Sequence, residues 1–195
     1  MKMMLEELMQ KLKTNMDEKR FLHSLGVMKT AAELAACYNA DVKKAEIAGL
    51  LHDCARDMDI EHQLKMVEYF GILLDDIQKR EKVLIHGPLG AVTAERDYGI
   101  ADEEILNAIK IHTTGDADMS MLDKIILLSD FIEPGRCYPG VEDLRVKAFI
   151  DLDDAIIGAF DSTIRYVLSK GSLLHPKTIS GRNFILMQRE SEGRA

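Results

Sequence analysis

The sequence has little of several residue types, and each shortage excludes a class of protein. It contains no tryptophan, four prolines and three cysteines in 195 residues. Cys37, Cys54 and Cys137 are odd in number and far apart, so we expect reduced thiols rather than a disulfide framework or a CxxC zinc or redox motif. The chain also has no proline-rich linker, no segment of low complexity and no internal repeat.

Long hydrophobic runs are absent as well. The longest apolar stretches, such as Ile125-Ile126-Leu127-Leu128, end at charged residues within a few positions, whereas a membrane-spanning helix needs about 20 apolar residues. The first residues, Met-Lys-Met-Met-Leu-Glu-Glu, carry acids where a signal peptide is apolar. We therefore expect a cytoplasmic protein without a membrane partner.

Positive charge is scarce relative to negative charge. The chain has 25 Lys and Arg against 33 Asp and Glu, which gives a net charge of −8. Binding to DNA or RNA depends on neutralising phosphates with these cations, so we expect no nucleic-acid partner. Apolar residues make up 47% and charged residues 30%, as is ordinary for a globular chain, and the length predicts a single domain over residues 1–195.

What the sequence does have is helical periodicity. Apolar residues recur at helical spacing, as in Leu5, Leu8, Met9 and Leu12, and alternating strand-like patterns are absent. We therefore predict an all-α fold. Helix starts are expected at Asn15, Asp41 and Asp102, and helix stops at Gly71, Gly99, Gly115 and Gly171. The predicted helices cover residues 2–13, 16–38, 42–56, 60–69, 75–81, 88–98, 102–111, 119–132, 152–169 and 181–190.

Histidines and aspartates recur along these helices in an order typical of a two-metal hydrolase site. The series consists of His23, the pair His52-Asp53, His86, His112 and Asp130. Imidazole and carboxylate ligands suit divalent transition metals, with iron, manganese, cobalt and zinc all permitted. We place His52 and Asp53 next to each other on one helix, about 100° apart, where the carboxylate can bridge two ions.

A histidine taken alone is more often an ordinary core or surface residue than a ligand. His62, between Glu61 and Gln63, is assigned to a solvated helix face for this reason. Asp53 differs because it follows Leu50 and Leu51, where burying an ionised carboxylate without a metal or a charged partner is costly.

The ordered set resembles the HD-domain superfamily of metal-dependent phosphohydrolases over about residues 18–135. Four further short motifs resemble one branch of this superfamily. They are Ser129-Asp130-Phe131-Ile132-Glu133-Pro134-Gly135-Arg136, His112-Thr113-Thr114-Gly115, His175-Pro176-Lys177-Thr178 and Arg182-Asn183. Over nearly the whole chain these motifs resemble the bacterial YqeK-type branch of HD proteins. That branch is associated with symmetrical hydrolysis of diadenosine tetraphosphate to two ADP, so the resemblance implies a helical HD-domain bundle with this activity.

The resemblance also implies roles for individual residues. His23, His52, Asp53 and Asp130 would hold the tighter metal ion, and His86 and His112 a second ion or the phosphate. Iron is favoured, with one or two ions bound, and Asp53 and Arg136 would be catalytic. Helices in about residues 140–190 would complete the nucleotide pocket, and the assignment leaves room for a homodimer. The residues expected to bind the dinucleoside polyphosphate or its ADP product are His23, Gly26, His86, His112, Thr113, Arg136, His175, Lys177, Thr178, Arg182 and Asn183.

Several of these residues also have ordinary interpretations. Arg56, Arg136, Arg145, Lys177 and Arg182 are candidates to offset polyphosphate charge. A surface charge or a helix-end pair is a better interpretation of Arg145 than of Arg136 or Arg182. Gly26 would let a nucleotide approach its helix, or would simply ease helix packing. Thr113, Thr114 and Gly115 would accept a phosphate, although a helix C-cap explains Gly115 equally well.

Three other functions remain open at this point. A nucleoside monophosphatase shares the same ligand order. An alarmone hydrolase of the superfamily typically carries Glu-Asp where this chain has Arg56-Asp57, which weakens that alternative. A non-catalytic nucleotide sensor is disfavoured because the ligand set is complete. Turnover with added metal distinguishes an enzyme from a sensor.

Overall fold

The protein is built entirely of helices. The computed structural model describes residues 2–193, with side chains from Leu5 onward, and contains no strand within this range. None of the described helices is long and apolar enough to cross a membrane. The elements are α1 (Lys2–Thr14), α2 (Glu18–Cys37), α3 (Val42–Leu51), α4 (Ile60–Tyr69), α5 (Asp76–Arg80), the 3₁₀ turn η1 (Lys82–Leu84), α6 (His86–Tyr98), α7 (Glu103–Ile111), α8 (Met121–Ile132), α9 (Val141–Ala148), α10 (Leu152–Ser169) and α11 (Pro176–Ser191).

Side-chain caps define most helix starts. Asp41 and Asp102 cap α3 and α7 as predicted, because their carboxylates accept backbone N–H groups of the first turn. The expected start at Asn15 was wrong, since Asp17 caps α2 and accepts the N–H of Arg20. The four predicted glycine stops all have positive φ, the conformation in which a residue without Cβ ends a helix at low cost.

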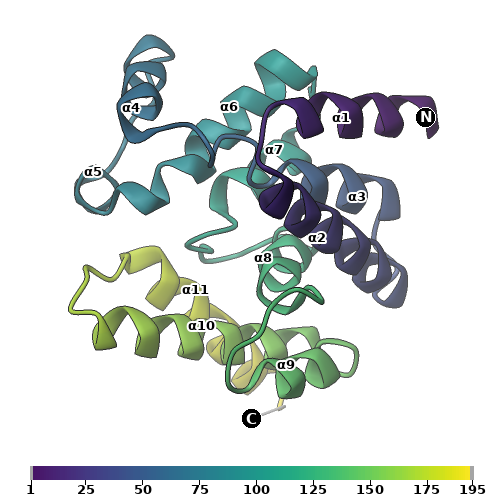
Figure 1. Ribbon diagram of the computed structural model, residues 1–195. Coiled ribbons are helices and arrows are strands. Elements are labelled where there is room, and N and C mark those ends of the chain that lie inside the picture. The colour runs from purple at the N-terminus through teal and green to yellow at the C-terminus, as the bar shows by residue number, and fades with distance from the viewer. Residues whose placement is uncertain (1, 194–195) are drawn as a thin grey trace.

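α8 lies at the centre of the molecule, between the helices that surround it (Figure 1). α2, α3 and α7 lie along one side of it, and the hairpin of α10 and α11 lies with α9 on the other. Leu34, Leu50, Ile109, Ile126 and Ile156 are fully buried where these helices meet, within one continuous core. Burying each such side chain contributes about 1.5–3 kcal/mol to folding. The central position of α8 brings Asp130, near its C-terminal end, close to α2 and to the turn after α3.

A second, smaller core lies beneath α4. It consists of Ala55, Val67, Ile85 and Leu89, with Phe70 and other half-buried side chains packed against it. α4 and α5 extend from the rest of the molecule at one edge (Figure 1). The turn that carries His52 and Asp53 therefore lies between two cores, and both fix its position.

Two predicted helices need correction, and one helix was missed. The helix expected over 42–56 ends at Leu51, and residues 52–57 form turns. The helix expected from 181 begins at Pro176, because proline at the first helical position loses no hydrogen bond and has a suitable φ. α9 was not predicted, although Val141, Leu144 and Ala148 are buried at helical spacing along it.

Candidate metal centre and phosphate cleft

His52 and Asp53 lie in a turn, not within a helix as predicted. α3 ends at Leu51, and the N–H groups of Cys54 and Arg56 donate to the carbonyls of Leu51 and Asp53, as in a 3₁₀ turn. Both side chains are nonetheless almost completely buried, with exposures of 0% and 2%. The tighter turn therefore directs the imidazole and the carboxylate into the same interior site.

Asp53 divides the ligands into two groups, one on each carboxylate oxygen. Its Oδ2 lies 3.9 Å from His23 Nε2 and 3.7 Å from His52 Nε2. Its Oδ1 lies 3.1 Å from His86 Nε2 and 3.6 Å from His112 Nε2. A carboxylate arranged in this way can bridge two cations.

Asp130 joins the first group. Its Oδ1 lies 3.0 Å from His23 Nε2 and 3.7 Å from His52 Nε2. The possible ligand atoms of His23, His52 and Asp130 lie within 4.8 Å of one another, as do those of His52, Asp53 and His112. The structure thus brings together all six residues of the predicted ligand series.

Backbone hydrogen bonds decide which nitrogen each buried histidine presents. Nδ1 of His52 donates to the Gly49 carbonyl at 2.8 Å, that of His86 to the Val83 carbonyl at 2.6 Å, and that of His112 to the Ile109 carbonyl at 2.7 Å. A carbonyl oxygen only accepts, so each Nδ1 carries the proton and each neutral ring presents an Nε2 lone pair. All three lone pairs are directed at the Asp53 carboxylate or at each other.

This arrangement suits a cation better than it suits the side chains alone. Nε2 of His23 lies 3.2 Å from Nε2 of His52, and Nε2 of His86 lies 3.1 Å from that of His112. Facing lone pairs repel unless a proton or a metal ion lies between them. Oδ1 of Asp53 is buried and has no hydrogen-bond partner among the described residues. Imidazole and carboxylate donors with an orphaned buried oxygen therefore fit a divalent transition metal.

The protonation states also favour metal binding at neutral pH. Complete burial lowers the pKa of His52 to about 4, so its imidazole is neutral. Burial alone would raise the pKa of Asp53, but the imidazoles that face the carboxylate outweigh burial and hold the pKa well below its usual value. A neutral imidazole and an ionised carboxylate are the forms that bind a metal.

Arginines from three elements surround the ligands. Arg56 Nη1 lies 3.5 Å from Asp53 Oδ1 and 3.1 Å from His86 Nε2. Arg136, in the loop after α8, pairs with the Asp130 carboxylate and donates to its carbonyl at 2.6 Å. Arg20 on α2, which the sequence interpretation missed, lies 3.1 Å from Asp53 Oδ2 and also pairs with Asp57. Its position three residues before His23, almost one helical turn, was the signal that could have identified it.

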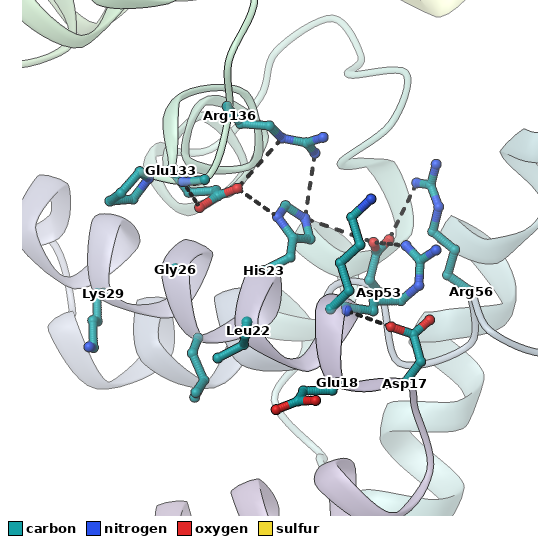
Figure 2. A pocket seen from close by; sticks show the side chains of 15 residues that line it. Asp17, Glu18, Leu22, His23, Gly26, Lys29, Asp53, Arg56, Glu133 and Arg136 are labelled. Carbon is teal, nitrogen blue, oxygen red and sulfur yellow. Dashed lines mark hydrogen bonds and ion pairs between the residues drawn. The ribbon is translucent and has the colours of Figure 1, made fainter.

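A cleft of about 850 Å³ opens over this centre. Figure 2 shows His23, Asp53, Arg56 and Arg136 directed into it. The cleft has room for the phosphates of a nucleotide, and its cations lie around the His and Asp ligands. The lining residues are Asp17, Glu18, Lys19, Arg20, Leu22, His23, Leu25, Gly26, Lys29, Asp53, Arg56, Glu133, Pro134, Gly135 and Arg136.

The C-terminal residues predicted to bind substrate lie outside this cleft. His175 Nε2 lies 2.7 Å from Asp75 Oδ2. The Lys177 Nζ donates to Asp116 at 2.6 Å, and that lysine lines a separate cavity of about 490 Å³.

The remaining predicted contacts have structural partners or lie at the surface. Thr178 Oγ1 donates to the Thr114 carbonyl at 3.0 Å, and Arg182 pairs with Asp161. Asn183 is exposed and Thr113 is half-buried. Nucleotide binding by these residues remains a prediction.

His62 and Arg145 lie in different surroundings. His62 is exposed on α4, as predicted. Arg145 is not a plain surface charge: its Nε donates to the Ile132 carbonyl, and its Nη2 to the carbonyls of Glu133 and Arg136, each at 2.8 Å. It therefore holds the loop that carries Arg136.

Comparison with known proteins agrees with this geometry. The HD domain family model matches residues 20–135. A protein of Halalkalibacterium halodurans named bis(5'-nucleosyl)-tetraphosphatase, symmetrical, is 40% identical over 93% of this chain and 97% of its own length. A Bacillus subtilis protein of the same name is 36% identical over the same shares. A crystal structure from Clostridium acetobutylicum, described as a predicted HD superfamily hydrolase involved in NAD metabolism, has a TM-score of 0.90 and 45% identity over 94% of this chain and 97% of its own.

Proposed function

The chain belongs to the HD domain family, and from this premise we propose that it is a metal-dependent hydrolase that cleaves diadenosine tetraphosphate symmetrically to two ADP. The observation that carries the proposal is Asp53, whose two oxygens each face a pair of imidazole nitrogens beneath a cleft lined by arginine. Relatives at 36–40% identity over most of the chain are named as symmetrical tetraphosphatases.

The metal ligands follow from the two groups on Asp53. His23, His52, Asp130 and Oδ2 of Asp53 would hold one ion, while His86, His112 and Oδ1 of Asp53 would hold a second. We propose iron as the native metal, with manganese, cobalt and zinc as chemically acceptable alternatives. When bound, the metal lowers the pKa of a water molecule toward neutrality and offsets charge on the phosphates.

The arginines would bind the polyphosphate on both sides of the scissile bond. Arg20 and Arg56 lie beside Asp53, whereas Arg136 lies beside Asp130. Guanidinium groups make paired contacts with phosphate oxygens. The substrate has one ADP half on each side of the cleaved bond. Arg20 and Arg56 would bind the phosphates of one half, and Arg136 would bind those of the other.

The reaction is a hydrolysis in which atoms balance simply. The water oxygen forms a bond to the second phosphorus from one nucleoside, and the bond from that phosphorus to the central bridging oxygen breaks. The attacked half becomes one ADP that carries the water oxygen, the bridging oxygen leaves on the other ADP, and the water protons pass to the products and to solvent. The arginines stabilise charge on the phosphoryl oxygens, and the departing polyphosphate is weakly basic, so we assign no general acid.

Product analysis tests the proposal. The chain is loaded with iron or manganese and given diadenosine tetraphosphate, AMP and NAD in parallel, with products separated by chromatography. ADP alone from the dinucleotide is the expected result. ATP plus AMP would overturn symmetrical cleavage, turnover of AMP alone would identify a monophosphatase, and binding without turnover would identify a sensor.

Two variants connect the activity to the metal centre. Asp53→Ala is expected to abolish turnover and tight metal binding, because it removes the carboxylate that faces both histidine pairs. His62→Ala, an exposed change on α4, is the matched control and should behave as the parent. Equal losses in both variants would contradict the assigned ligands.

The proposed function also bears on domain organisation, location and partners. We propose that residues 1–195 act as one domain in the cytoplasm, with a small-molecule nucleotide as the partner and with no nucleic acid or membrane bound. We keep a homodimer as the expected alternative to a monomer, to be decided by light scattering on the metal-loaded chain.

A further inference from the structure

His23 differs from the other three histidines in the way its ring is held. His52, His86 and His112 each donate Nδ1–H to a carbonyl three residues earlier. Gly49 and Ile109 lie in the last turns of their helices, where carbonyls lack helical partners, and Val83 lies in η1. His23 lies inside α2, where the preceding carbonyls are used by the helix, so its Nδ1 needs an acceptor from elsewhere.

Glu133 supplies that acceptor. Its Oε1 lies 3.1 Å from Nδ1 of His23, and its Oε2 accepts the N–H of Gly135 at 2.6 Å. The residue is only 5% exposed although it caps the end of α8 beside the open cleft. Figure 2 shows the carboxylate between the Arg136 loop and α2, connected to both His23 and Arg136 by dashed lines.

Two glycines leave space for this carboxylate. A Cβ at Gly26 would lie 2.5 Å from Oε2 of Glu133, and a Cβ at Gly135 would lie 2.9 Å from Oε1. Real Cβ atoms do not approach this closely, so an alanine at Gly26 would force the buried carboxylate to move. The space that Glu133 needs therefore explains why residue 26 is a glycine, without a nucleotide at this position.

We propose that Glu133 is the positioning residue of His23, that it holds the Nδ1 proton so that the Nε2 lone pair faces the metal, and that Gly26 is needed to admit it. This inference rests on the metal-dependent function proposed above. A carboxylate behind a ligand histidine fixes its tautomer and makes it a stronger donor, and losing such a partner typically costs about 10- to 100-fold in metal affinity. Glu133 need not contact the substrate to have this effect.

Zinc binding to Glu133→Gln tests the proposal directly. Glu133 accepts from the ring N–H of His23 and from the backbone N–H of Gly135. Glutamine offers one oxygen and one NH₂, so one of these two N–H groups would face the NH₂ group and lose its acceptor. We expect the Kd for Zn²⁺, measured by calorimetry with a competing chelator, to rise about 10- to 100-fold. Glu68→Gln, an exposed change on α4, is the matched control.

An NMR signal separates positioning from general damage. In the zinc-loaded chain, the Nδ1 proton of His23 should resonate at low field because its acceptor is a carboxylate. In Glu133→Gln this signal should move upfield, while the Nδ1 signals of His52, His86 and His112 stay in place. A folded Glu133→Gln with parental zinc affinity would overturn the inference and leave the hydrolase intact, whereas a parent chain that binds no metal would overturn both.

Gly26→Ala provides an independent route to the same carboxylate. Alanine favours the helix, so the variant should fold, yet it should weaken zinc binding by displacing Glu133. Combined with Glu133→Gln it should add little further loss, because both changes remove one interaction. Fully additive losses would overturn the link between Gly26 and Glu133.

Discussion

Arg136 lies in a loop, where its own side-chain contacts hold it. It lies four residues past the end of α8, pairs with the Asp130 carboxylate and lies 3.5 Å from His23 Nε2. A metal on Asp130 would compete with this ion pair, and the guanidinium would then face the phosphates of the proposed substrate.

Arg136→Ala is expected to slow hydrolysis of diadenosine tetraphosphate by about 10- to 1000-fold, as when about 1.4–4 kcal/mol of transition-state charge stabilisation is lost. Metal content should stay at the parental value, because Arg136 is not a ligand. Steady-state kinetics together with elemental analysis measure both quantities. A variant that loses its metal would show instead that Arg136 supports Asp130.

His52 connects the site to acid stability. The pKa of this buried imidazole is lowered from 6.5 to about 4, so between these values the unfolded chain binds a proton that the folded chain does not. The free energy of unfolding therefore decreases as pH falls from 6.5 to 4, by about 3 kcal/mol from this residue. Burial lowers the pKa of His86 in the same direction.

The pKa of His23 shifts in the opposite direction, above its usual value. Burial lowers its pKa, but the hydrogen bond and charge of Asp130 outweigh burial and raise it overall. The measurement is therefore a comparison: urea denaturation of the metal-free chain at pH 7 and pH 4.5, with and without His52→Gln. The variant should lose less stability on acidification than the parent, and equal losses would contradict the assigned shift.

At the scale of elements, α9 matters to the site through Arg145. This side chain donates to the carbonyls of Ile132, Glu133 and Arg136. α9 carries none of the proposed ligands, yet it fixes the loop after α8 that carries Arg136. Arg145→Ala is expected to destabilise the chain by about 1–3 kcal/mol and to reduce turnover, because the carbonyls lose charged donors. Glu142→Ala, which removes only an exposed partner of Arg145, should change little. Urea denaturation and kcat measure both effects, and an Arg145→Ala chain as stable as the parent would mean that water satisfies these carbonyls.

Local signals in the sequence predicted most of the helices, but not α9 or the connections between the helices. Helical spacing and caps such as Asp41 and Asp102 are local signals, and the six residues proposed as ligands stand out by their order along the chain. The turn at His52-Asp53 could not be distinguished from a continuing helix, because apolar residues precede it and the turn depends on two cores meeting there. Arg20 and Glu133 were missed as functional residues because their partners lie 33 and 110 positions away.

For the whole molecule, the centre draws together α2, the turn after α3, the start of α6, the end of α7 and α8. A metal bound there would link segments distributed from residue 23 to residue 130. Any ligand that binds only the folded chain stabilises it, by about 2.7 kcal/mol at a free concentration of 100 times its Kd.

The metal-loaded chain is therefore expected to melt about 5–10 °C above the chelator-treated chain, given about 2–4 °C per kcal/mol for a protein of this size. Scanning calorimetry at several manganese concentrations measures the shift. Asp53→Ala should show none of it, and a parental Tm that does not respond to any of the candidate metals would contradict a metal centre at this position.

The spread of the ligands along the chain also sets the order of events during synthesis. Asp130 leaves the ribosome last among the six, after the histidines that surround it have been made, and α8 must then take its central position before the ligand set is complete. A metal held by all six residues would therefore bind a nearly finished protein, and the cleft lined by His23 and Asp53 would be its route. Under the proposed ligand assignment, loading the metal would be a step separate from folding, and the choice of metal would be made after the chain has folded.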